Sequence, residues 1–104
     1  MNIMAAIVHH AIDLRSRINQ SAQQLKSFDE EVERIEADQK RLRENIESLS
    51  KTAEAKGLIA RYIAKAGEQE TRLEEMEKER KTISAEKERL ERELAVAITV
   101  FEIK

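Results

Sequence analysis

Apolar residues recur through the first half of the chain at alternating steps of four and three residues. The series is Ile7, Ala11, Leu14, Ile18, Ser21, Leu25, Phe28, Val32, Ile35, Gln39, Leu42, Ile46 and Leu49, with two polar members. A mean spacing of 3.5 residues keeps one face of an α-helix turned toward a partner helix, as in a coiled coil. The pattern therefore predicts a long helix over about residues 4–49.

A second unbroken series occupies the other half of the chain. It consists of Ile59, Tyr62, Ala66, Gln69, Leu73, Met76, Arg80, Ile83, Lys87, Leu90, Leu94, Ala97 and Phe101. The two series are out of phase, so the helix must be interrupted between them. Ser50–Thr52 lies near the midpoint and is the expected turn, followed by a second helix over about residues 53–100. We expect the Thr52 hydroxyl to cap that helix and Glu54 to lie in its first turn.

Two arms of similar length around a short turn predict an all-α fold, a single antiparallel coiled-coil hairpin spanning residues 1–104. Core partners should then have numbers that sum to about 101. In that register the flanking residues face each other as compatible charges. The expected pairs are Arg17 with Glu86, Glu31 with Arg72, Asp38 with Lys65 and His10 with Glu93. We expect the chain to form a homo-oligomer, and a dimer of two hairpins arranged as a four-helix bundle is one form that it could take.

Polar residues also occur within the seam, at Ser21, Gln39 and Arg80. Polar layers in coiled coils usually fix the register of the helices at some cost in stability. We interpret these three residues as register-setting, with a functional polar site as the less favoured alternative.

Both ends of the hairpin carry more apolar residues than a two-helix seam can cover. At the open end they are Ile3, Met4, Val8, Val96, Ile98, Val100, Phe101 and Ile103, and at the turn end they are Leu58 and Ile63. Contiguous exposed apolar surface usually marks a contact. We expect the open end to pack against a second hairpin or a neighbouring domain, the alternative being frayed or repacked ends. The strand-like composition of residues 99–103 predicts that the second helix stops early.

Composition narrows the class of protein. Of the 104 residues, 38% are charged, three are aromatic and none is proline, which fits either long helices or disorder. The regular spacing of the apolar residues favours long helices over disorder. A net charge of −2 without a basic block makes nucleic acid an unexpected partner. The apolar opening stretch is too short to span a bilayer and lacks a signal-peptide pattern, so we expect no membrane insertion and take the cytoplasm as the default compartment.

No pattern in the sequence indicates catalysis, a cofactor or a metal. His9 and His10 are adjacent, so on a helix they point about 100° apart and cannot easily share one ion. Phosphate-binding glycine loops and nucleophile motifs are missing. We therefore expect no enzyme activity. A loose basic cluster near the turn leaves one alternative, a helical arm that docks nucleic acid or a nucleoprotein. Its members are Arg41, Arg43, Arg61, Lys65 and Arg72.

Residues 38–46, 61–63 and 69–74 have the sequences DQKRLRENI, RYI and QETRLE. Over about residues 32–95 the chain resembles the coiled-coil segment of bacterial mucoidy-inhibitor-like proteins, a family of poorly defined function. The resemblance implies a helical module within a larger bacterial protein and carries over no catalytic residue. That segment commonly has a glycine where this chain has Ser50. The sequence thus predicts a structural spacer or a protein-interaction and oligomerisation module.

Overall fold

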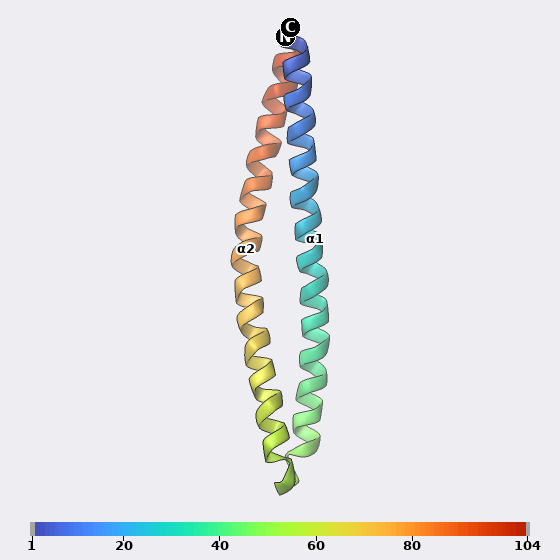
Figure 1. Ribbon diagram of the computed structural model, residues 1–104, viewed down its shortest axis with the longest axis vertical. Coiled ribbons are helices and arrows are strands. Elements are labelled where there is room, and N and C mark those ends of the chain that lie inside the picture. The colour runs from blue at the N-terminus through green and yellow to red at the C-terminus, as the bar shows by residue number, and fades with distance from the viewer. Residues whose placement is uncertain (1, 104) are drawn as a thin grey trace. The chain divides into compact units, whose positions relative to one another are not determined.

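The computed structural model describes residues 2–103, and this part of the chain forms two long helices (Figure 1). Helix α1 is Ile3–Leu49, a 3₁₀ turn η1 is Ala53–Ala55, and helix α2 is Lys56–Ile103. Residues 2–103 contain no strand. The predicted all-α fold of two helices forming a hairpin is confirmed.

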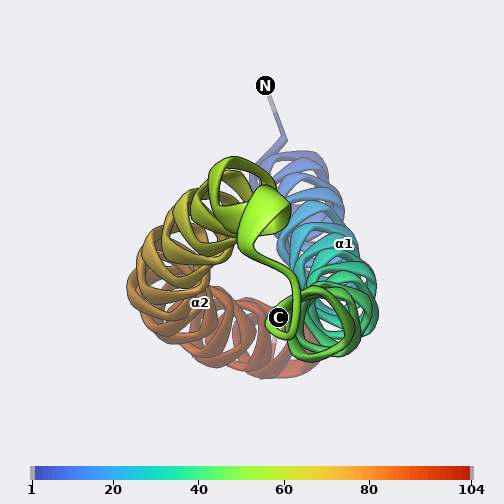
Figure 2. The ribbon, with the colours of Figure 1, turned by 90° about the horizontal axis from the view of Figure 1, so that it is seen from below.

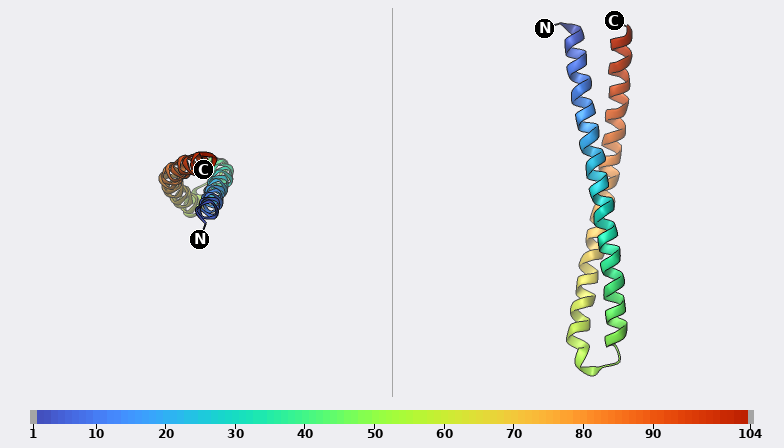
Figure 3. Two further views of the ribbon diagram at one scale, coloured as in Figure 1. Left: turned by 90° about the horizontal axis from the view of Figure 1, so that it is seen from above. Right: turned by 90° about the vertical axis from the view of Figure 1, so that its right-hand side faces the viewer.

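Each helix takes part in two compact units. The open-end unit comprises residues 2–27 and 79–103 among those described, and the turn unit comprises residues 28–78. Within the open-end unit, the N-terminal part of α1 and the C-terminal part of α2 lie side by side (Figures 1 and 3). In both units the two helices run antiparallel, because a single short connection reverses the chain.

The core of the open-end unit comes from both predicted seams. Leu14 and Ile18 of α1 pack with Leu90, Leu94 and Ala97 of α2, and Ala11 packs against this cluster. Leu14 and Leu90 are almost completely excluded from solvent. Burying such a leucine side chain contributes about 1.5–3 kcal/mol, so these layers hold the two helices together.

In the turn unit the buried residues include Phe28 and Leu42 of α1 and Met76 of α2. Half-buried seam residues such as Ile46 and Ile59 continue the contact toward the turn. Along the whole chain, every member of the two predicted series is buried or half-buried except Phe101, which is 41% exposed. The spacing of apolar residues therefore identified the contact face of both helices.

Charged side chains beside the seam form the ion pairs that the antiparallel register predicts. The carboxylate of Glu31 accepts two hydrogen bonds from Arg72, at 2.7 Å from Nε and 3.1 Å from Nη2. Arg17 Nη2 lies 3.3 Å from Glu86 Oε1, and Lys65 Nζ lies 3.3 Å from Asp38 Oδ2. These three cross-helix pairs confirm the register.

The same contacts shift the acidity of the carboxyl groups. The hydrogen bonds from Arg72 hold the pKa of Glu31 below its ordinary value. Hydrogen bonds from Arg41 and then from Gln69 lower the pKa of Asp38 in the same way, since both stabilise the ionised form.

The fourth expected pair, His10 with Glu93, is not formed as an ion pair among the described residues. Both residues line the same surface hollow, but Glu93 is bonded by Arg89, one turn earlier on α2. Arg89 also bonds Glu86, and this contact with Arg89 is the main reason that the pKa of Glu86 is lowered. Glu93 therefore pairs with Arg89 on its own helix and not with His10 across the seam.

The connection between the helices needs no glycine, because no residue in the described chain has a positive φ angle. Amide hydrogen bonds close it, from Ser50 to Ile46 O at 2.9 Å and from Thr52 to Leu49 O at 3.1 Å. Figure 2, seen from below, shows a short turn of helix between the ends of α1 and α2. The serine at position 50 is thus compatible with the reversal of the chain.

Two local expectations are wrong. The Thr52 hydroxyl does not cap the second helix; it donates to Leu49 O at 3.1 Å and so satisfies the end of α1 instead. The second helix does not stop early either, since α2 continues to Ile103. Residues 99–103 stay helical despite their strand propensity, because Leu94 and Ala97 just before them are buried against α1. The Thr99 hydroxyl also donates a hydrogen bond to Ala95 O at 2.9 Å.

Candidate protein-docking surface

The apolar residues expected at the open end lie on the surface of the open-end unit. Of the eight predicted residues, seven are exposed and Met4 is half-buried. The most exposed is Ile103 at 78%, and Ile98 is 44% exposed. These side chains belong to well-formed helical turns, so their exposure follows from the direction in which each helix face points.

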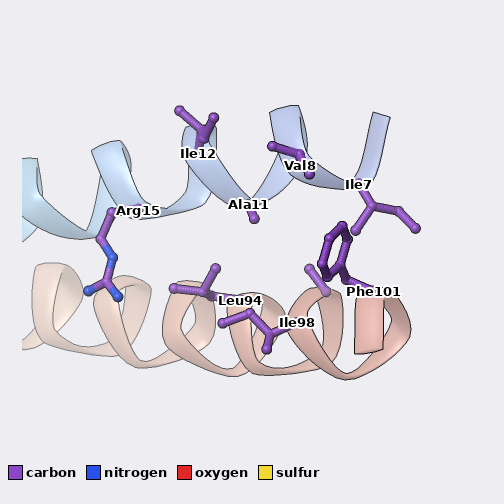
Figure 4. A pocket seen from close by; sticks show the side chains of 9 residues that line it. Ile7, Val8, Ala11, Ile12, Arg15, Leu94, Ile98 and Phe101 are labelled. Atoms are coloured by element: carbon purple, nitrogen blue, oxygen red, sulfur yellow. The ribbon is translucent and has the colours of Figure 1, made fainter. Parts of the chain in front are cut away.

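A groove of about 340 Å³ runs between α1 and α2 on one flank of this unit. It is lined by Ile7, Val8, Ala11, Ile12, Arg15, Leu94, Ala97, Ile98 and Phe101. Figure 4 shows the ring of Phe101 standing between the helices and the side chain of Arg15 reaching from α1 toward α2. Arg15 is the single charged residue of the lining. We call this feature the open-end groove.

The groove exists because apolar residues occupy helix positions that coiled coils usually give to charges. Val8 and Ile98 directly flank the seam, where Glu and Lys are common. Ile12 lies one turn after Val8 on the same face and is 62% exposed. Ile12 was missed among the expected surface residues, although its spacing of four from Val8 could have identified it.

The other flank of the seam is hollowed as well. This second hollow, of about 310 Å³, is lined by Ile7, His10, Glu93, Val96, Ala97 and Val100. It shares Ile7 and Ala97 with the open-end groove, so the two hollows lie on either side of the same contact between the helices. Its lining includes two ionisable residues, which makes it the more polar of the two flanks.

Among the described residues, Arg15 has neither an ion pair nor a hydrogen bond. It differs in this from Arg17 two residues later, which contacts both Asp13 and Glu86. A cation without a partner at the end of an apolar groove fits a docking surface whose partner supplies a carboxylate.

The turn end presents less apolar surface. Ile63 is 57% exposed, whereas Leu58 is half-buried. A hollow near the turn is lined by Glu44, Glu47, Ser48 and Lys51, all of them polar. An isolated exposed isoleucine is ordinary on a protein surface, so the open end is the stronger candidate.

The polar seam residues are positioned in the contact between the helices. Ser21 is buried, and Gln39 and Arg80 are half-buried. Gln39 Nε2 donates to Glu70 Oε1 at 2.7 Å, across the seam. Such a bond forms in one alignment of the helices, which is compatible with a role in setting the register.

Three of the five basic residues expected to cluster near the turn contact carboxylates, whereas Arg43 and Arg61 are exposed and have no ion pair among the described residues. Arg41 and Lys65 both contact Asp38, and Arg72 contacts Glu31. Their charge is therefore largely compensated within the molecule, which reduces their attraction for phosphate.

Residues 2–103 contain no group of three or more His, Asp or Glu side chains placed to hold a metal ion. His9 and His10 are both exposed. Over the same residues, neither helix has a stretch long and apolar enough to cross a membrane.

Comparison of the chain with protein-family models, with curated proteins and with solved structures finds no match.

Proposed function

We propose that this chain is a non-catalytic structural module that joins proteins through the apolar surface of its open-end unit. The observation that carries the proposal is the open-end groove, with Val8, Ile12, Ile98 and Phe101 exposed along two neighbouring helices. Apolar residues grouped in this way lose contact with water when a partner covers them, which favours association.

The arrangement of the two helices supports this use of the surface. Leu14, Leu90 and Leu94 anchor α1 to α2 directly beside the groove. The groove is thus held in shape before any partner binds, and a preformed surface loses less entropy on binding than a frayed end would.

The resemblance of residues 32–95 to the coiled-coil segment of mucoidy-inhibitor-like proteins fits the same proposal. We place the module in a larger bacterial protein of the cytoplasm, where the open end meets a neighbouring domain or a second copy. The alternative of a nucleic-acid arm is less well supported, because Arg41, Lys65 and Arg72 are paired with acids. This leaves only Arg43 and Arg61 of the basic cluster without an ion pair among the described residues.

The test replaces two exposed isoleucines of the groove with glutamine, in the double variant Ile12→Gln/Ile98→Gln. Glutamine keeps helix propensity but removes the apolar surface. We expect the unaltered chain to enhance the fluorescence of an apolar dye when dilute and to associate when concentrated. The double variant should lose both properties and keep its helical circular dichroism.

Ile63→Gln is the matched control, since Ile63 is about as exposed as Ile12 but lies in the turn unit. It should leave dye binding and association unchanged. An unaltered chain that neither binds the dye when dilute nor associates at any concentration would contradict the proposal, because the apolar residues would then be covered within the monomer.

A further inference from the structure

We propose that the occupant of the open-end groove is a second copy of this chain, reversed in direction, so that Arg15 of each copy faces Glu102 of the other. This inference rests on the proposed function, because it names the partner of the same surface. It follows from where the two charges lie relative to the centre of the groove.

The centre of the groove is the level of Ile7 and Leu94, which both line it and whose numbers sum to 101. Arg15 lies eight residues beyond Ile7 along α1, and Glu102 lies eight residues beyond Leu94 along α2. At 1.5 Å per residue each is about 12 Å from the centre. Because the helices are antiparallel, the two charges are displaced in opposite directions.

Arg15 lines the groove, and Glu102 lies beside it on α2, next to the lining residue Phe101. Glu102 follows Ile98 by four residues and Arg15 follows Ile12 by three, and such spacings place side chains on one face of a helix. Both residues are exposed, and neither has an ion pair or hydrogen bond among the described residues. One surface thus carries an unpaired cation at one end and an unpaired anion at the other.

A twofold axis perpendicular to the helices, through the level of Ile7, brings these ends together. It places Arg15 of one copy at the level of Glu102 of the other, twice in the symmetric dimer. The same rotation places Ile12 at the level of Ile98 and Phe101 of the second copy. The rotation lays α1 of one copy over α1 of the other, so the apolar residues of the two grooves cover one another. Arg15 reaches from α1 across the groove toward α2 (Figure 4), and in this way it approaches Glu102 of the second copy.

A twofold axis parallel to the helices would instead place each residue at the same height along the helices as its equivalent in the second copy. Arg15 reaches across the groove toward α2 (Figure 4), so in that arrangement the two Arg15 side chains would approach each other near the axis. Like charges brought together at an interface are costly, and this cost favours the reversed arrangement.

The first test exchanges the charges. Arg15→Glu and Glu102→Arg should each raise the dissociation constant of the dimer at least about tenfold, because each places like charges together. The double variant Arg15→Glu/Glu102→Arg should restore it to within about threefold, since the opposite charges meet again. Arg92→Glu, which reverses an exposed charge away from the groove, is the matched control. Sedimentation equilibrium at low salt measures all five proteins.

The second test determines whether the two copies in the dimer run in opposite directions or in the same direction. The chain has no cysteine, so Gln23→Cys takes a single spin label on the exposed face of α1 in the open-end unit. Residue 23 lies sixteen residues from Ile7, and reversal separates the two labels by about 48 Å along the helices. A parallel dimer would leave only the lateral separation, below about 35 Å, at one or two helix diameters plus the label linkers.

The outcomes separate this inference from the proposed function. A dimer that Ile12→Gln/Ile98→Gln disrupts but the charge exchange does not rescue overturns the pairing of Arg15 with Glu102. A short label distance overturns the reversed direction. A monomer at every concentration that still binds the apolar dye overturns self-association, while the docking surface stands and belongs to a different protein.

Discussion

Among the ion pairs across the seam, the one between Glu31 and Arg72 is joined by two hydrogen bonds, which Arg72 donates through Nε and Nη2. Glu31 with Arg72 followed directly from the antiparallel register, because long side chains that flank the seam at one level have few other partners. Gln69 is different: partner numbers that sum to 101 place it at the level of Val32, yet its Nε2 donates to Asp38 Oδ2 at 2.6 Å. A flexible amide side chain can reach several nearby carboxylates, and the spacing of residues in the sequence does not predict which one it bonds.

The pair of Glu31 and Arg72 predicts a pH dependence of stability. The pKa of Glu31 is lowered in the folded state from an ordinary value of 4.5, so its stabilisation is complete above that value. It is lost as the pH falls through the lowered pKa. Glu31→Gln should therefore reduce the free energy of unfolding by about 0.5–1 kcal/mol at pH 7 and by much less near pH 3. Urea denaturation followed by circular dichroism measures both values.

Glu30→Gln is the matched control, because Glu30 is exposed and has no ion pair among the described residues. It should change stability little at either pH. A loss at Glu31→Gln that is equal at pH 7 and pH 3 would mean that the carboxylate charge does not stabilise the fold.

At the scale of elements, the two seams gave the number of helices and the place of the turn, because a change of phase in the apolar repeat cannot occur within one continuous seam. The end of α1 at Leu49 coincides with the last residue of its series. The start of α2 is less regular, since the 3₁₀ turn Ala53–Ala55 precedes Lys56. A 3₁₀ turn of three residues is too short to change the seven-residue pattern of apolar positions, so the pattern did not predict it.

Gly67 provides a test at this scale. It lies in the middle of α2, and no atom lies within 4 Å of the place where a Cβ would stand. The helices therefore do not need a glycine for close approach there. Gly67→Ala should raise the free energy of unfolding by about 1 kcal/mol, because alanine has the higher helix propensity. Equilibrium denaturation measures the change.

Gly57→Ala is the companion variant. Gly57 also has open space around it but lies in the first turn of α2, where helix propensity counts for less. Its effect should be smaller than that of Gly67→Ala. A loss of stability at Gly67→Ala would indicate that another molecule packs closely against this part of α2.

At the scale of the whole molecule, the large exposed apolar residues of the described chain lie in the open-end unit, with the exception of Ile63 in the turn unit. The sequence predicted this asymmetry, because apolar residues outside the seam concentrate at the two ends of the chain. It did not predict the groove. Ile12 and Arg15 form the groove together with residues near position 98 on the other helix. These segments are far apart in the sequence, and only the fold brings them together.

We infer that the open end is buried in an assembly and that the turn unit is not. Amide hydrogen exchange, followed by mass spectrometry over a range of concentrations, tests it most directly. We predict that protection of residues 3–15 and 94–103 rises with concentration, that residues 35–70 do not change, and that Ile12→Gln/Ile98→Gln abolishes the rise. Exchange at the open end that is the same at every concentration, or protection that rises in the turn unit instead, would contradict the claim.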